Sequence, residues 1–227
     1  FSSLWRFKES LVQHQLSDEL FNTINASLEQ KGLFVKKGTA VDATILQSTS
    51  RPLSKKKREE LELSPSAQID TDATSTEKGG KKYFGYKGHI GADVESKLIR
   101  KRTYTTAAPH DSTEFGNLLS GDEKGIWADS AYINKNKKRV ARFLGIYFGV
   151  LDRGVRSHPL SNKQKKNNRK KSAVRAVVEH PFAFMKTKLH LLKATAKNLE
   201  RNALRFTMNC INYNLLRADF LIRRQLS

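Results

Sequence analysis

The chain has 227 residues and a formal net charge of +20, from 42 Lys and Arg against 22 Asp and Glu. This length can bury a full hydrophobic core, and such an excess of positive charge indicates a polyanionic partner, with nucleic acid the leading candidate. A membrane-spanning protein is excluded because the sequence has no run of about 18 apolar residues. The single cysteine, Cys210, excludes a disulfide framework and a cysteine-based zinc site, and fits a reducing compartment.

A small helical segment is predicted over residues 1–33. Ser17 is placed to cap a helix, and Gly32 follows that helix as a stop signal. Between them, apolar residues recur at four-residue spacing, at Leu20, Ile24 and Leu28. Because the chain starts at Phe1 without a methionine, we expect this segment to be the remnant of a longer N-terminal domain.

Strands are predicted in the next part of the chain. Residues 34–46 mix β-branched and apolar residues, which is typical of a strand. Residues 48–82 are polar and contain prolines and two adjacent glycines, which predicts a long loop. Residues 82–94 and 98–108 then predict two strands joined in a hairpin.

Helices alternate with strands in the remainder of the chain. Asp111 and Glu114 resemble a capping box that opens a short helix. Strands are predicted within 125–132, ending near Asp129, and over 145–152. Helices are predicted over 133–143, 172–190 and 197–222, and a basic, mobile connector over 154–171. This order of elements predicts an α/β domain over residues 34–227, with a mixed sheet.

Three acidic residues are notable for their positions. Asp42 lies inside an apolar predicted strand, where Asp fits poorly. Asp129 lies at the C-terminal end of a predicted strand, the edge at which open α/β sheets build their sites, and Glu179 follows two valines on a predicted helix. One hypothesis is that the three meet around Mg²⁺, because a hard cation takes carboxylate oxygens and offsets their mutual repulsion. The alternatives are a turn Asp at 129 and an ion-paired surface Glu at 179.

The helix that carries Glu179 also carries basic residues. At about 100° per residue, Ser172, Arg175, Glu179 and Lys186 fall within roughly 80° of one another around a continuous helix. This spacing predicts a metal-binding carboxylate beside two phosphate-binding side chains. Pro181 lacks a backbone donor, and we expect it to kink this helix without breaking it.

Five stretches, in this order, resemble the DDE transposases of the IS5 group within the IS4-like superfamily. They are GTAVDATILQS with Asp42, the glycine-rich residues 70–96, TTAAPHDS at 105–112, WADSAY with Asp129, and RAVVEHPFAFMK with Arg175, Glu179 and Lys186. The last stretch matches the R-(3)-E-(6)-K part of the family signature, although Ser172 stands where that signature has Tyr. The resemblance extends from about residue 4 to residue 220.

The resemblance implies an RNase H-like catalytic core that cuts and joins the ends of a mobile element. It implies that Asp42, Asp129 and Glu179 are catalytic and hold Mg²⁺, for which Mn²⁺ can substitute. The DNA-binding residues it implies, together with the adjacent basic pair, are Arg175, Lys186, Lys170 and Lys171. The implied partner is double-stranded DNA, as terminal inverted repeats and target DNA, engaged by a homodimer. The implied location is the bacterial cytoplasm, in association with the nucleoid.

The sequence therefore leaves three functions open. The first is an active DNA-cutting and strand-transferring enzyme, which the three retained acids favour. The second is a catalytically inactive DNA-binding remnant, which Ser172 and the missing start favour. The third, another RNase H-like nuclease, is disfavoured by the Arg and Lys spacing. Trp127 is interpreted as a core residue beside the site, with stacking on a DNA base as the alternative.

Overall fold

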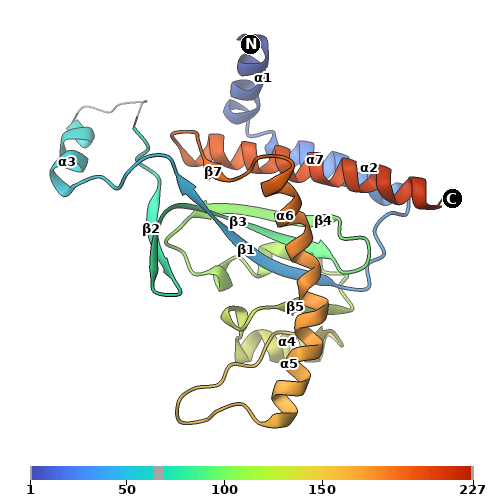
Figure 1. Cartoon of the computed structure of the whole chain (residues 1–227). Helices are drawn as coiled ribbons and strands as arrows, with labels where there is room; N and C mark the ends of the chain where they lie inside the picture. The colour runs from blue at the N-terminus through green and yellow to red at the C-terminus, as the bar shows by residue number, and fades with distance from the viewer. Residues whose placement is uncertain (1, 64–68, 226–227) are drawn as a thin grey trace.

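The computed structural model describes residues 2–63 and 69–225, and within them a seven-stranded mixed sheet lies between helices (Figure 1). The strands are β1 (Thr39–Ser48), β2 (Thr74–Lys78), β3 (Lys81–Asp93), β4 (Ile99–Thr106), β5 (Gly125–Ala128), β6 (Tyr147–Phe148) and β7 (Lys193–Ala194). The α-helices are α1 (Ser2–Gln13), α2 (Ser17–Gln30), α3 (Lys55–Leu63), α4 (Lys135–Phe143), α5 (Asn162–Arg175), α6 (Glu179–Thr187) and α7 (Leu199–Gln225). Short 3₁₀ turns are η1 (Asp111–Thr113), η2 (Gly116–Leu118), η3 (Ser130–Tyr132) and η4 (Ala176–Val178).

The strand order of the sheet is β2-β3-β1-β5-β6, with β4 also paired to β3 and β7 to β1. β3 pairs antiparallel with β1, β2 and β4. β1 pairs parallel with β5 and β7, and β5 pairs parallel with β6. The fold is therefore the predicted RNase H-like α/β architecture, a mixed sheet flanked by helices. No helix in the described ranges is both long enough and apolar enough to cross a membrane.

Alternating side chains along the strands form a buried core on each face of the sheet. One core contains Ala40 and Ile90 from the sheet together with Val178, Met185 and Phe206 from η4, α6 and α7. The other core contains sheet and turn residues, namely Val41, Phe115, Leu118, Ile126, Ala128, Tyr132 and Val150. Because Ala40 and Val41 belong to different cores, β1 is covered on both faces, which explains its apolar sequence.

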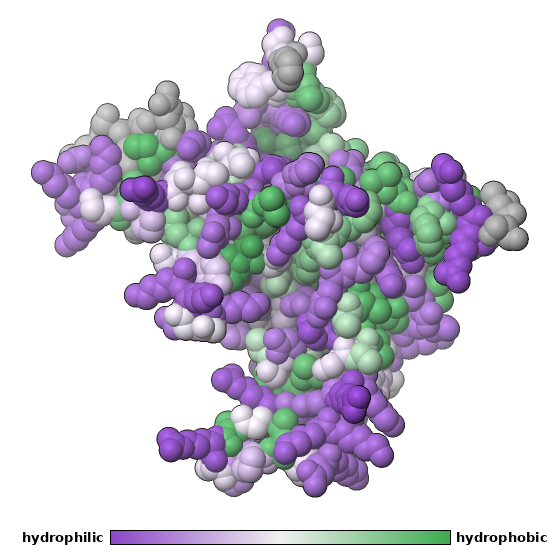
Figure 2. Space-filling model, viewed as in Figure 1, coloured by the Kyte–Doolittle hydropathy of each residue, from purple (hydrophilic) through white to green (hydrophobic). Residues whose placement is uncertain are grey.

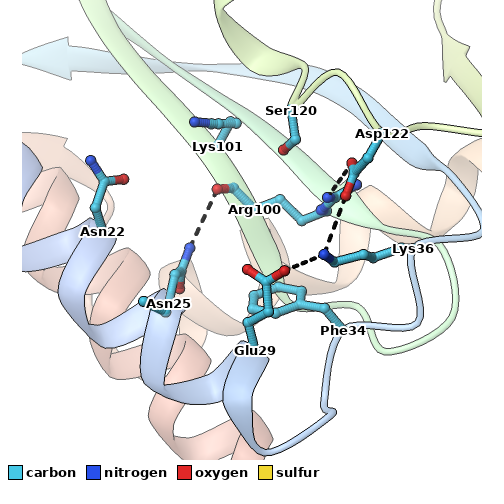
Figure 3. A pocket seen from close by; sticks show the side chains of 10 residues that line it. Asn22, Asn25, Glu29, Phe34, Lys36, Arg100, Lys101, Ser120 and Asp122 are labelled. Carbon is cyan, nitrogen blue, oxygen red and sulfur yellow. Dashed lines mark hydrogen bonds and ion pairs between the residues drawn. The ribbon is translucent and has the colours of Figure 1, made fainter.

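The N-terminal helix α2 packs into the same core as the sheet. Its Phe21 is buried in the cluster that contains Ile90 and Phe206. A polar cavity of about 320 Å³ lies between α2 and the sheet (Figure 3). Four of the charged residues in its wall pair with one another: Lys36 joins Glu29 and Asp122, and Arg100 joins Asp122. We therefore interpret this cavity as a structural junction.

Two elements form where a polar loop was predicted over residues 48–82, namely α3 and β2. β2 and β3 make a hairpin whose two-residue turn is Gly79-Gly80, with φ of +59° and +73°. Positive φ at both turn positions is the conformation that suits a tight hairpin, and glycine adopts it readily. The Gly-Gly dipeptide was therefore a hairpin signal that the loop prediction overlooked.

Several predicted boundaries are wrong, for local reasons. β1 starts at Thr39 rather than at residue 34, because Lys36 adopts a φ of +58° and donates its N–H to Asp93. α5 starts inside the predicted connector over 154–171, where Ser161 and Gln164 form a capping box. The capping box expected at Asp111 and Glu114 is absent, because the His110 side chain caps a 3₁₀ turn there instead.

Gly85 allows β1 and β3 to approach closely, and its replacement gives a first testable prediction. It has a φ of +151°, and an added Cβ would lie 2.3 Å from the carbonyl oxygen of Leu46. We expect Gly85→Ala to lower the free energy of unfolding by about 2 kcal/mol or more, because backbone strain and overpacking add. Urea denaturation measures this difference. Gly116→Ala is the control, because a Cβ there meets no atom within 4 Å, and equal effects of the two substitutions would contradict the prediction.

Candidate active site

The parallel pairing of β1 and β5 brings Asp42 and Asp129 together. The paired register runs from Thr39 with Ile126 to Val41 with Ala128. Asp42 follows Val41 on β1, and Asp129 follows Ala128 at the end of β5. The two carboxylates therefore lie side by side, one position after the last pair of the register. Both line one cavity of about 250 Å³. Asp129 is the first residue after β5, and its side chain accepts a hydrogen bond from the Ala131 N–H.

Asp42 is mostly buried, and its surroundings determine its charge state. Burial raises the pKa of Asp42 above its usual range, and the nearby Asp129 contributes in the same direction. The N–H of Ala43, the guanidinium of Arg175 and the ammonium of Lys78 favour the ionised form and oppose this shift. A further cation near Asp42 would stabilise its ionised form, because the cation would offset both the desolvation of the carboxylate and its repulsion by Asp129.

Arg175 connects Asp42 with Glu179. Its Nη1 atom lies 2.8 Å from Asp42 Oδ2, and its Nη2 atom lies 3.1 Å from Glu179 Oε1. The Glu179 side chain is 62% exposed, whereas those of Asp42 and Arg175 are 22% and 21% exposed. The structure therefore places Glu179 at the rim, joined to the Asp42–Asp129 pair through a guanidinium.

A second hollow, of about 490 Å³, adjoins the first along β1. Ala43, Ile45 and Lys78 line both hollows, and Glu179 and Lys186 line the second. Burial lowers the pKa of Lys186, and the positive charge of Lys78 lowers it further. Two cations so close together disfavour each other, so an anion such as phosphate would stabilise both.

The helix that carries Arg175, Glu179 and Lys186 is interrupted, but not at Pro181. Its break is the 3₁₀ turn η4, which separates α5 from α6. Pro181 is the third residue of α6, a position where the missing backbone N–H has no intrahelical partner to lose. The structure therefore has an irregular turn immediately before Pro181, where a kink was predicted. Glu179 and Lys186 still line the same hollow, because both belong to α6.

The two other predicted DNA-binding lysines differ in their surroundings. Lys170 is exposed on α5. Lys171 is partly buried, and its Nζ atom donates to Val150 O and Asp152 Oδ2, both at 2.9 Å. Lys171 therefore fastens α5 to the segment that follows β6.

Sequence reasoning did not identify several residues of the cavity. Lys78 comes from the β2–β3 hairpin, and Lys87 from β3 forms a 2.9 Å ion pair with Asp111. Tyr132 also lines the cavity, and its buried hydroxyl has no hydrogen-bond partner among the described residues. Burial raises the pKa of Tyr132, so this phenol stays protonated and free to donate a hydrogen bond. Lys78 and Lys87 lie in the stretch over residues 70–96 and Tyr132 lies in WADSAY, but the sequence did not single out these side chains.

The residues present can be compared with what a divalent cation requires. Asp42 and Asp129 supply carboxylate oxygens, which are the donors that Mg²⁺ and Mn²⁺ prefer. No group of three His, Cys, Asp or Glu side chains within residues 2–63 and 69–225 is arranged to hold a metal ion. The two aspartates therefore provide the donor type that such an ion prefers. The third predicted ligand, Glu179, does not join them in this structure and instead forms an ion pair with Arg175.

The family model described as Transposase DDE domain matches residues 34–215 of this chain. The match covers β1 with Asp42, β5 with Asp129 following it, and the α5–α6 region with Arg175 and Glu179. It thus includes every residue of the candidate site.

Proposed function

The chain belongs to the transposase DDE domain family, and from that premise we propose that the cavity of Asp42 and Asp129 cuts and joins DNA. The reaction is hydrolysis of a phosphodiester at the ends of an insertion sequence, followed by attack of the freed 3′-hydroxyl on target DNA. The observation that carries the proposal is the register of β1 and β5, which leaves two carboxylates side by side in one cavity.

Each residue of the cavity has a role in this proposal. Asp42 and Asp129 hold divalent cations, Mg²⁺ or Mn²⁺, which when bound activate the attacking oxygen and stabilise the leaving one. Glu179 would supply a further carboxylate to these cations when it is not paired with Arg175. Lys78 and Lys186 bind the phosphates of the DNA beside the cavity, and the Tyr132 hydroxyl donates to a phosphate oxygen.

The surface charge supports DNA as the substrate. The chain carries a net charge of +20, and hydrophilic side chains cover most of the face seen in Figure 2. Cations that neutralise phosphates release counterions from DNA, so binding driven by this charge weakens as salt is raised. The proposed partners are the terminal inverted repeats of the element and its target DNA.

The test is cleavage of DNA that contains the flanks of the coding region, where the terminal repeats are to be found. We expect nicking or double-strand cleavage with Mg²⁺ or Mn²⁺, and binding without efficient cleavage with Ca²⁺, whose bonds are longer and whose coordination is looser. Products are resolved on denaturing gels. Binding to these ends without cleavage under either active metal would favour the inactive remnant.

A further inference from the structure

The surface formed by α4 and β6 combines exposed aromatic rings with cations. Phe143 is 89% exposed and Tyr147 is 54% exposed, and Val140 and Leu144 beside them are also exposed. In Figure 2, hydrophobic side chains lie among hydrophilic ones in the region where Figure 1 shows α4 and α5. Monomeric proteins seldom leave grouped apolar side chains in water without a binding role.

This surface, which we call the α4–β6 edge, is strongly basic. The sequence has no Asp or Glu between Asp129 and Asp152, and the cations in that interval are Lys135, Lys137, Lys138, Arg139 and Arg142. A shallow hollow of about 560 Å³ at the edge is lined in part by Lys124, Lys138, Arg142 and Tyr147. Within residues 2–63 and 69–225, none of these three cations forms an ion pair.

The acids nearest in sequence to Lys124 are already paired elsewhere. Asp122 pairs with Arg100 and Lys36, and the buried Glu123 lies 3.6 Å from Arg100. These acids therefore do not neutralise the positive charges of the α4–β6 edge, and the edge favours binding of a polyanion. A second copy of this chain, itself at +20, is disfavoured by charge repulsion.

The Tyr147 ring of this surface is supported by a second aromatic ring. Tyr147 packs on Trp127 with ring centroids 5.6 Å apart. Trp127 in turn lies against Gly38, Gly125 and Gly149, where an added Cβ would come within 2.3 to 2.6 Å of its ring. A rigid, half-exposed ring among cations is a suitable platform for an unpaired base, whereas paired bases in a duplex keep their faces covered.

The edge is connected to the candidate active site through β5, which pairs with β1 and with β6. Trp127 precedes Asp129 by two residues, so the two positions point to the same side of β5. The register pairs Gly125 with Tyr147, which places Tyr147 on that side as well. Tyr147 therefore lies on the same side of the sheet as Trp127.

We propose that the α4–β6 edge binds a single-stranded segment of DNA, with Tyr147 and Phe143 stacking on bases and Lys124, Lys138 and Arg142 contacting phosphates. The inference rests on the proposed function only in taking DNA as the polyanion. It adds a binding site outside the carboxylate cavity, with a preference for unpaired strands.

The test compares labelled single-stranded oligothymidylate of about 20 nucleotides with a duplex of the same length, at fixed salt, by fluorescence anisotropy. We expect Tyr147→Leu and Phe143→Leu each to weaken single-strand binding by about fivefold or more, because the stacking ring is lost while apolar bulk is kept. Duplex binding should change by less than about twofold, and Tyr147→Phe should bind like the parent, because its ring remains. Phe220→Leu is the control, as it removes a half-exposed ring from α7.

Two outcomes would overturn the proposal. Equal losses for single strand and duplex would mean that the edge contacts only phosphates. Unchanged DNA binding, with a lower mass in solution for the two leucine variants, would mean that the edge joins copies of the chain. Failure of the proposed cleavage is read separately, because the anisotropy measurement is made without divalent metal and does not depend on whether the parent cuts DNA.

Discussion

Asp129→Asn is expected to abolish DNA cleavage while leaving DNA binding intact or slightly tighter. The substitution removes one charged donor from a two-aspartate site, and a loss of several kcal/mol of charge stabilisation corresponds to a rate decrease of about a thousandfold or more. Binding survives because the phosphates meet one negative charge fewer. Cleavage is measured on end-containing DNA with Mg²⁺, and binding is measured with Ca²⁺ present.

Asp129 is a sharper choice for this test than Asp42. Asn can still accept the hydrogen bond from the Ala131 N–H, so the local fold should persist, and thermal unfolding checks this. Asp42→Asn would also remove the 2.8 Å ion pair with Arg175. The control is Asp219→Asn, which deletes one charge from the 58% exposed Asp219 on α7. Normal cleavage by Asp129→Asn would exclude the proposed catalytic role.

The general fold could be predicted because its longer strands contain β-branched, aromatic or apolar residues and are separated by turn signals. Both faces of β1 are buried, and β3 and β4 carry such residues among lysines and arginines. The shorter elements could not be predicted in full. β6 lies inside the strand predicted over 145–152 but is only two residues long, and the two-residue β7 was not predicted. The extent of both depends on pairing with a neighbouring strand, which local sequence does not encode.

The candidate site was predictable only in part, for a related reason. Asp42 and Asp129 were conspicuous because a carboxylate in an apolar strand or at its end conflicts with its surroundings. Lys78 lies in a hairpin concealed within a polar stretch, and Lys87 is a cation on a buried strand whose partner, Asp111, is supplied by a distant turn. The ion pair of Arg175 with Glu179 follows from their four-residue spacing on a helix. The ion pair with Asp42 depends on how α5 crosses β1, so no spacing rule could have indicated it.

Arg175 is therefore expected to act on metal binding as well as on DNA. Its guanidinium is bound to Asp42 Oδ2 and Glu179 Oε1, two oxygens that the proposed function assigns to a divalent cation. An ion that binds there must compete with a positive charge already in place. The fork of the guanidinium reaches both carboxylates at once, which a lysine ammonium cannot do with the same geometry.

Arg175→Ala should consequently bind Mn²⁺ about tenfold more tightly than the parent, although it cleaves DNA more slowly. The affinity rises because a competing charge is removed and an Asp42 oxygen is freed, and a tenfold change corresponds to about 1.4 kcal/mol. Cleavage falls because Glu179 and the DNA phosphate lose their positioning partner. Arg175→Lys should be intermediate in both respects. Electron paramagnetic resonance of free Mn²⁺ measures the affinity without any reference to activity.

The matched control is Arg223→Ala, because Arg223 forms an ion pair with Asp219 four residues earlier on α7, the same sequence separation as in the Arg175–Glu179 pair. It removes one positive charge and one helical ion pair at a distance from the cavity, so it corrects for the change in net charge. We expect its Mn²⁺ affinity and cleavage rate to match those of the parent. If Arg175→Ala bound Mn²⁺ no more tightly than Arg223→Ala, the ion pair with Asp42 would not compete with the metal. Arg175 would then act through DNA alone, as a phosphate-binding residue.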